Sequence, residues 1–214
     1  VPLAQNKMVF LSLKYGKPVI IATEMLQSMI DEPRATRAEI SDAAHGVFQH
    51  ADALMLSNET AIGKYPVQAV ETLSKVSITI ETEQKKTHHD KLNSGPYVPP
   101  EITCEITYLG AKLADELNAR YLVAYTNTGY TAQQLAKQRI FTPIITITPS
   151  ETVARQLILT WGLNEVIVKK INLKEEINEL KKLLRNKLKV KKKDKIVIVS
   201  NSNTKERLIT SIVI

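Results

Sequence analysis

Small hydroxyl and acidic residues gather directly after two apolar segments in the first third of the chain. Thr23 follows the run PVIIA, and Ser57 and Glu59 follow the run ADALML. A threonine hydroxyl and the backbone N–H groups after it can bind a carboxylate or phosphate oxygen, whereas a serine near a carboxylate can orient water, a proton or a metal ion. The residues around Thr23 would also suit a helix cap, so residue type alone leaves both interpretations open.

A second cluster of hydroxyl groups lies in the other half of the chain, between a predicted strand and a predicted helix. Hydroxyls and a glycine at that position could form a phosphate-binding cradle. The segment has neither the GK[ST] of a P-loop nor the GxGxxG of a dinucleotide-binding fold. Binding a phosphorylated ligand and simply capping the helix therefore remain alternatives. The candidate residues are Thr126, Thr128, Gly129 and Thr131.

The other reactive residue types argue against several kinds of site. No histidine is placed for a serine-nucleophile triad, so hydrolase chemistry is not predicted. His88 and His89 are predicted to lie in a surface linker rather than to bind metal. The single cysteine, Cys104, rules out an internal disulfide and is typical of the reducing cytoplasm. No apolar run approaches the ~18 residues of a membrane-spanning helix, so no membrane contact is expected.

The net charge of +7 is concentrated in one segment of the chain. Residues 165–195 hold twelve Lys/Arg and five Asp/Glu, which accounts for the whole excess. Apolar residues recur there at three- and four-residue spacing, as in an amphipathic helix with its lysines toward solvent. No aromatic residue interleaves with the lysines to stack on bases. We therefore predict a solvated helix and no nucleic-acid partner.

Alternating helices and strands are predicted to position the first cluster. Their order, helix, strand, helix, strand, helix, indicates an α/β fold with parallel strands. Both strands are continuous apolar runs, as in strands buried on both faces. Because two strands cannot form a stable sheet alone, partner strands from elsewhere or a larger barrel are expected. Helices are predicted over residues 2–15 and 66–83, and a further helix is predicted to start at 36 with a Thr36–Glu39 capping box. The strands are predicted over 18–22 and 51–56.

The alternation resumes after a polar segment rich in proline, residues 84–100. It predicts a separate α/β domain with about five strands. One of its helices is expected to start with a capping box of Thr148, Pro149 and Glu151 and to stop at Gly162. Four helices are predicted: one over residues 101–118, one that ends at 138, one that starts at 149 and one in the lysine-rich segment. The strands are predicted over 121–125, 143–147, 165–168, 195–199 and 208–214.

Residues 17–66 resemble the signature region of the pyruvate kinase family. The matching motifs are KPVIIATEMLQSM, PRATRAE, DAAHGV, MLSNET and GKYP. The later segments TNTGYTAQQLAKQR and TPSETVARQLILTWG resemble that family's C-terminal regulatory domain. The resemblance covers essentially the whole chain, more loosely beyond about residue 165.

The resemblance implies a fold and two alternative functions. Residues 1–85 would be the last strands and helices of a (β/α)8 barrel, 86–100 a linker, and 101–214 a regulatory α/β domain with a mixed sheet of about five strands. The chain would then be a fragment of a cytoplasmic, homotetrameric glycolytic enzyme that transfers phosphate from phosphoenolpyruvate to ADP, giving pyruvate and ATP. The alternative is a non-catalytic regulatory and oligomerisation module that binds a phosphorylated effector.

Roles for individual residues follow from the same resemblance. Thr23 corresponds to the threonine that contacts phosphoenolpyruvate, and Ser57 and Glu59 to the active-site rim. Arg37 corresponds to a residue of a subunit-interface helix that supports the neighbouring active site. The family's catalytic lysine and its ligands for Mg²⁺, with K⁺ as a candidate second ion, would precede Val1. The chain alone is therefore expected to hold no metal and to be inactive.

The chain also departs from the family pattern. Glu24 replaces the usual glutamine, and an ionised carboxylate there would repel an anionic substrate. His45-Gly46 and Gln49-His50 replace Asn-Ala and Asp-Gly of the family. The turn SNSNTKER has no glycine where the family's glycine-rich loop closes over a sugar bisphosphate. We therefore expect a sugar-phosphate or nucleotide monophosphate effector, with Lys205 and Arg207 as charge partners.

Overall fold

The computed structural model describes residues 2–86, 102–171, 177–188, 190–201 and 207–213. The chain divides into two compact units, Val1–Pro96 and Tyr97–Ile214. Nearly all of the predicted linker, with His88 and His89, and the predicted charge partner Lys205 lie outside the described residues. Among the described helices, none combines the length and apolar character needed to cross a bilayer.

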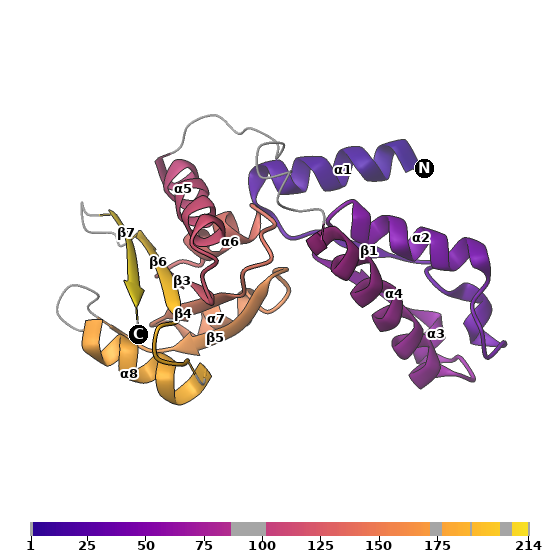
Figure 1. Ribbon diagram of the computed structural model, residues 1–214. Coiled ribbons are helices and arrows are strands. Elements are labelled where there is room, and N and C mark those ends of the chain that lie inside the picture. The colour runs from indigo at the N-terminus through magenta and orange to yellow at the C-terminus, as the bar shows by residue number, and fades with distance from the viewer. Residues whose placement is uncertain (1, 87–101, 172–176, 189, 202–206, 214) are drawn as a thin grey trace. The chain divides into compact units, whose positions relative to one another are not determined.

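The first unit contains two strands and the helices around them (Figure 1). β1 and β2 pair in parallel, with Ile21 opposite Leu54. The short helix α3 was not predicted, because the segment after β2 was interpreted as a loop. The elements are α1 (Pro2–Tyr15), β1 (Ile20–Ala22), the 3-10 helix η1 (Gln27–Ile30), α2 (Arg37–Phe48), β2 (Ala53–Met55), α3 (Asn58–Ala61) and α4 (Pro66–Lys86).

The core of the first unit forms where the helices pack on one side of β1. Ile21 belongs to a buried cluster with residues of α1, α2 and α4. The prediction that both strands are buried on both faces is wrong for this chain, since Ile20 is 42% and Met55 45% exposed. Ile20 pairs with Ala53 and Met55 with Ala22, and among the described residues no third strand pairs with β1 or β2. The buried cluster comprises Val9, Ile21, Met25, Leu26, Met29, Ala43, Ala51, Ala69 and Leu73.

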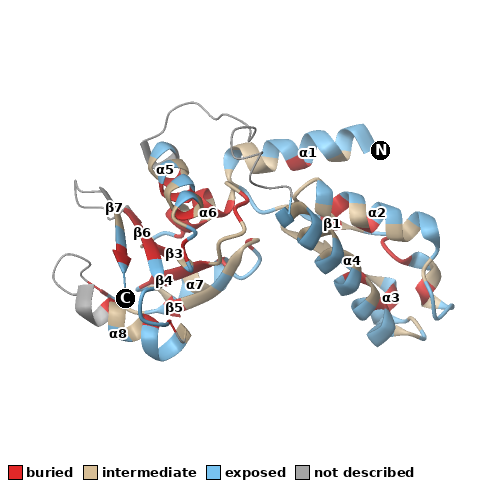
Figure 2. Cartoon of the chain, viewed as in Figure 1, coloured by how far each residue is buried: buried red, intermediate tan, exposed pale blue. Residues whose placement is uncertain are grey.

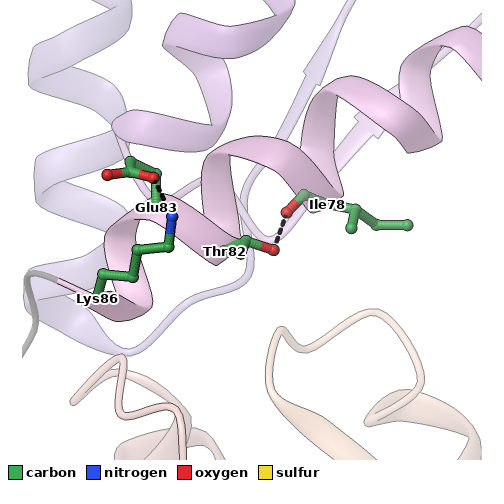
Figure 3. A network of polar contacts seen from close by, with 4 residues as sticks. All are labelled: Ile78, Thr82, Glu83 and Lys86. Atoms are coloured by element: carbon green, nitrogen blue, oxygen red, sulfur yellow. Dashed lines mark hydrogen bonds and ion pairs between the residues drawn. The ribbon is translucent and has the colours of Figure 1, made fainter.

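The end of α4 is held by local contacts rather than by the core (Figure 3). The Thr82 hydroxyl donates to the Ile78 carbonyl at 2.6 Å, and Lys86 Nζ lies 2.9 Å from Glu83 Oε2. Exposed ion pairs of this kind contribute little stability. A lysine in the last turn also complements the partial negative charge of the helix C-terminus.

The second unit is an α/β domain with a mixed five-stranded sheet, as predicted. The strand order is β5-β4-β3-β6-β7, in which β7 alone is antiparallel to its neighbour. Because β3, β4, β5 and β6 are parallel, their carboxyl ends lie at the same edge of the sheet. The elements are α5 (Ile102–Glu116), β3 (Tyr121–Tyr125), α6 (Tyr130–Ala136), β4 (Ile144–Thr148), α7 (Glu151–Gln156), β5 (Leu163–Val168), α8 (Ile177–Leu188), β6 (Lys195–Asn201) and β7 (Arg207–Val213).

Helices cover both faces of this sheet, so its central strands are buried (Figure 2). On one face Val123, Ile145 and Ile198 form a cluster with Leu180 and Leu184 of α8. Within the lysine-rich segment, α8 is thus an amphipathic helix that packs on the sheet, as the spacing of its apolar residues predicted. On the other face α5 and α6 contact the sheet and each other.

Two details of α7 correct the sequence prediction. Its N-cap is Ser150, whose Oγ accepts a hydrogen bond from Val153 N at 3.3 Å, whereas Thr148 is the last residue of β4. Both serine and threonine can cap a helix, and the sequence pattern could not fix where the strand ended. Gly162 does not stop the helix, which ends at Gln156, but adopts a φ of 78° just before β5.

Two helical glycines provide a matched test of the packing. A Cβ on Gly110 of α5 would lie 2.3 Å from Val199 Cγ2, whereas one on Gly46 of α2 would lie 2.9 Å from Leu54 Cδ2. Val199 is a stiff β-branched residue of a central strand, and the Leu54 methyl group can move. Gly110→Ala should therefore lower the free energy of unfolding by about 1–3 kcal/mol. Gly46→Ala should change it by less than about 1 kcal/mol, because alanine favours the helix.

Urea unfolding of both variants, followed by circular dichroism, measures these effects. Val199→Ala removes the methyl group that clashes, so the cost of Gly110→Ala should disappear in the double variant. Equal losses for Gly110→Ala with and without Val199→Ala would contradict the packing described for α5.

Candidate functional site

The parallel pairing of β1 and β2 brings two of the predicted polar segments to one edge of the first unit. Ala22 pairs with Met55 at the ends of the two strands. Thr23 follows Ala22 directly, and Ser57 begins the turn into α3. We call residues 23–30 the β1 loop. The β1 loop contacts the segment that carries Ser57 and Glu59 through the hydrogen bond from Leu26 N to Glu59 Oε1.

The β1 loop starts with two residues in the left-handed conformation. Thr23 has a φ of 73° and Glu24 a φ of 53°. This region is costly for any residue other than glycine, and most of all for a β-branched one such as threonine. Among the described residues the Thr23 hydroxyl has no hydrogen-bond partner, and Thr23 is exposed. Strained backbone of this kind persists only where the surroundings enforce it, and it concentrates at functional sites.

Glu59 is the first of two carboxylates that hold the β1 loop. Its side chain is only 1% exposed. Oε1 accepts a hydrogen bond from Leu26 N at 2.9 Å, and Oε2 accepts one from Ser57 N at 2.8 Å. Burial raises the pKa of Glu59, but the N–H donors outweigh it and hold the pKa below its usual value. Glu59 is therefore an ionised internal brace between the two segments.

Glu39, in the first turn of α2, is the second carboxylate. It accepts hydrogen bonds from Ser28 N at 2.6 Å and Ser28 Oγ at 2.5 Å. It also accepts them from Thr36 N at 2.7 Å and Thr36 Oγ1 at 2.8 Å. The bond from Thr36 N and the bond that Glu39 N donates to Thr36 Oγ1 at 3.3 Å form the predicted capping box. Burial raises the pKa of Glu39, and the bonds from Ser28 and Thr36 bring it below the usual value. We call Glu39 and Glu59 together the carboxylate clamp.

The sequence did not reveal the contact of Glu39 with the β1 loop. The motif T-x-x-E predicted a capping box and thereby accounted for this residue completely. The only signal that could have shown more is the serine at position 28, placed soon after the strand and before the helix. Loop geometry decides whether such a serine reaches the capping glutamate, and that geometry cannot be read from spacing.

A third contact holds the far end of the β1 loop. Lys64 N donates to the Ile30 carbonyl at 2.8 Å. Lys64 Nζ also lies 2.8 Å from Asp31 Oδ1, with both side chains more than 60% exposed. The backbone contact is the more important one, since an exposed ion pair is screened by water and salt. The β1 loop is thus held by α2, by α3 and by the turn before α4.

Two further predicted residues lie outside these contacts. Arg37 is the first residue of α2 and is exposed, as is Glu24.

Within the described residues there is no group of three or more His, Cys, Asp or Glu that could hold a metal ion. The two clamp carboxylates already accept hydrogen bonds on both oxygens. They do not fit a divalent cation, because their oxygens are directed at N–H and O–H donors of the protein.

The predicted phosphate cradle lies after β3 in the second unit. Thr126 is 1% exposed, and its Oγ1 accepts a hydrogen bond from Gly129 N at 3.0 Å. Gly129 has a φ of 86°, and a Cβ there would approach Val153 and Leu157 at 3.3 Å. Thr131 is buried and Thr128 exposed. The turn is therefore ordered by its own hydroxyl, and since α6 has seven residues, its dipole adds little for an anion.

Comparison with known proteins relates both units to the same family. The profile of the family described as "Pyruvate kinase, barrel domain" matches residues 1–70, and that of "Pyruvate kinase, alpha/beta domain" matches residues 105–213. Pyruvate kinase 2 of Synechocystis sp. is 42% identical over 168 residues, which are 78% of this chain and 28% of that protein. A pyruvate kinase of Mycobacterium tuberculosis is 37% identical over 203 residues, 94% of this chain and 42% of that protein.

A solved structure extends the similarity to the fold. The crystal structure of a pyruvate kinase from Cryptosporidium parvum matches with a TM-score of 0.80 at 29% identity, over 99% of this chain and 43% of that one. This chain thus spans less than half the length of these relatives. The strand-end site, the mixed sheet and the matches to both domains lead to one conclusion: the chain belongs to the pyruvate kinase family and comprises the end of its barrel domain and its C-terminal α/β domain.

Proposed function

We propose that this chain is part of an enzyme that transfers phosphate from phosphoenolpyruvate to ADP, and that Thr23 lies in its substrate site. The observation that carries the proposal is the position of Thr23 at the carboxyl end of a barrel strand, where the residue is strained and exposed and its hydroxyl has no partner among the described residues. Functional groups of such barrels lie at this end of the strands. The matches to both domains of the family support the reaction class.

In this proposal the chain contributes binding and orientation rather than a nucleophile. Phosphoryl transfer depends mainly on positioning and on neutralising charge. The Thr23 hydroxyl donates a hydrogen bond to an anionic oxygen of the substrate. Ser57, whose side chain makes no capping bond, borders the same edge. Divalent and monovalent cations typical of the family would neutralise the charge of the phosphoryl group. The described part of this chain does not supply the residues that would hold these cations.

The assembly and regulation are proposals of the same kind. Arg37 is exposed at the start of α2 and is available to a neighbouring subunit of a homotetramer. The turn Thr126–Thr131 is the proposed effector site. A regulatory module without catalysis remains the second candidate, favoured by the completeness of the second unit, whose five strands all belong to this chain.

The first expected result is that the purified 214-residue chain makes no ATP from phosphoenolpyruvate and ADP. The physical reason is charge neutralisation: within the described residues no group of three or more His, Cys, Asp or Glu could hold the divalent cation that the transferred phosphoryl group requires. A coupled assay of pyruvate release measures it, with the Mycobacterium tuberculosis relative as the positive control. Turnover that rises with the concentration of the pure chain would contradict this expectation.

The second expected result concerns Thr23 in a complete enzyme. A chimera would join this chain to the preceding part of the Mycobacterium tuberculosis relative. There Thr23→Val should lower kcat/KM for phosphoenolpyruvate about 10- to 100-fold, since a hydrogen bond to a charged group contributes roughly 1.5–3 kcal/mol. Thr79→Val, which removes an exposed hydroxyl bonded to the Lys75 carbonyl of α4, is the control. Equal kinetics for the two variants would remove Thr23 from the substrate site.

The third expected result is that the chain binds a phosphorylated small molecule at the turn after β3, and a monophosphate in preference to a bisphosphate. Titration calorimetry with AMP, ribose 5-phosphate, glucose 6-phosphate and fructose 1,6-bisphosphate measures it. Thr128→Val removes the exposed hydroxyl of the turn and should weaken binding, whereas Thr152→Val on α7 serves as a control. Heat from the bisphosphate alone would contradict the preference, and heat from none would contradict the site.

A further inference from the structure

The carboxylate clamp has a geometry that goes beyond a general contribution to stability. Glu59 accepts from Leu26 N and Glu39 from Ser28 N, so the two carboxylates bind N–H groups two residues apart on the β1 loop. They reach the loop from different helices, α3 and α2. Each also binds a donor of its own segment, Ser57 N for Glu59 and Thr36 N for Glu39. Each carboxylate therefore links the loop to a separate element.

The bonds lie directly after the strained residues. Thr23 and Glu24 hold positive φ angles, and the chain then turns inward so that Met25 and Leu26 are buried. A loop free to relax would return Thr23 to an ordinary conformation, because the left-handed region is unfavourable for threonine. Fixing the N–H groups of Leu26 and Ser28 prevents that relaxation. The position of the Thr23 hydroxyl thus depends on two acidic side chains that it does not touch.

We infer that Glu39 and Glu59 are paired positioning residues, which hold the β1 loop so that the Thr23 hydroxyl faces the substrate. This inference rests on the proposed function for its catalytic consequence, but not for the clamp itself. It assigns to Glu59 a role inside the protein rather than contact with substrate. It also gives the capping glutamate Glu39 a second role that is separable from helix capping.

Amide hydrogen exchange on the 214-residue chain tests the clamp without any assay of activity. Glu59→Gln should accelerate exchange of the Leu26 amide, and Glu39→Gln that of Ser28, by about tenfold or more. Thr36→Ala removes the capping hydroxyl but leaves Ser28 bonded to Glu39, so it should loosen the start of α2 with much less effect on Ser28. Glu71→Gln, exposed on α4, should leave both amides unchanged.

Kinetics of the chimera with the Mycobacterium tuberculosis relative test the positioning. Glu39→Gln and Glu59→Gln should each lower kcat/KM for phosphoenolpyruvate by about tenfold or more, as displacement of a substrate-orienting group does. Thr36→Ala weakens the helix cap and so serves as a control for a general loss of thermal stability. Its kcat/KM should stay near the parent value. Because both carboxylates act on one loop, the double variant should lose less than the product of the single losses.

Each outcome supports or overturns one step. Unchanged exchange at Leu26 and Ser28 in both glutamine variants overturns the clamp. Faster exchange with kcat/KM no lower than in Thr36→Ala overturns the positioning role. If the parent chimera is inactive, the proposed function fails, while the exchange data still decide the clamp. If the buried Glu59→Gln variant does not fold, the partly exposed Glu39→Gln variant alone decides both steps.

Discussion

Beyond the end of a parallel strand, backbone N–H groups no longer have acceptors on the neighbouring strand and need other hydrogen-bond acceptors. Most of the first unit is arranged so that the N–H groups after β1 find such acceptors. Unpaired N–H groups in a buried loop are costly. After β1 the partners are side-chain carboxylates, Glu59 for Leu26 and Glu39 for Ser28. Because these acceptors come from α2 and α3, the loop, both helices and the strand pair form one connected structure.

The second unit meets the same requirement differently. After β3, Thr126 N donates to the carbonyl of Ile147, and the Thr126 hydroxyl accepts from Gly129 N. Its partners are therefore neutral, and they come from the adjacent strand or from the turn itself. The two strand-end sites of the chain thus differ in electrostatics: ionised carboxylates order one, and a threonine hydroxyl orders the other. The ordering of the first depends on charged groups, and that of the second does not.

Periodicity and turn residues predicted the parallel pairing, the five-stranded sheet and the element order except for η1 and α3, because these follow from local apolar patterns and from capping motifs such as Thr36–Glu39. They also placed Thr23, Ser57 and Glu59 at strand ends. The burial of β1 and β2 on both faces was wrong, since burial depends on neighbours that a local pattern does not specify. The N-cap of α7 was misplaced from Ser150 to Thr148, because either hydroxyl satisfies the pattern. The link from Glu39 to Ser28 depends on the path of the β1 loop, which only the three-dimensional structure gives.

The two halves of the carboxylate clamp differ in sequence separation, and this difference has a consequence for the order of folding. Ser28 and Glu39 are 11 residues apart, whereas Leu26 and Glu59 are 33 apart. Closing a short loop costs less entropy than closing a long one. The Glu39 contact can therefore form as soon as α2 acquires its first turn, before any strand pairs. The Glu59 contact requires β2 to dock beside β1, so the left-handed conformation of Thr23 should be among the last local features of this unit to become fixed.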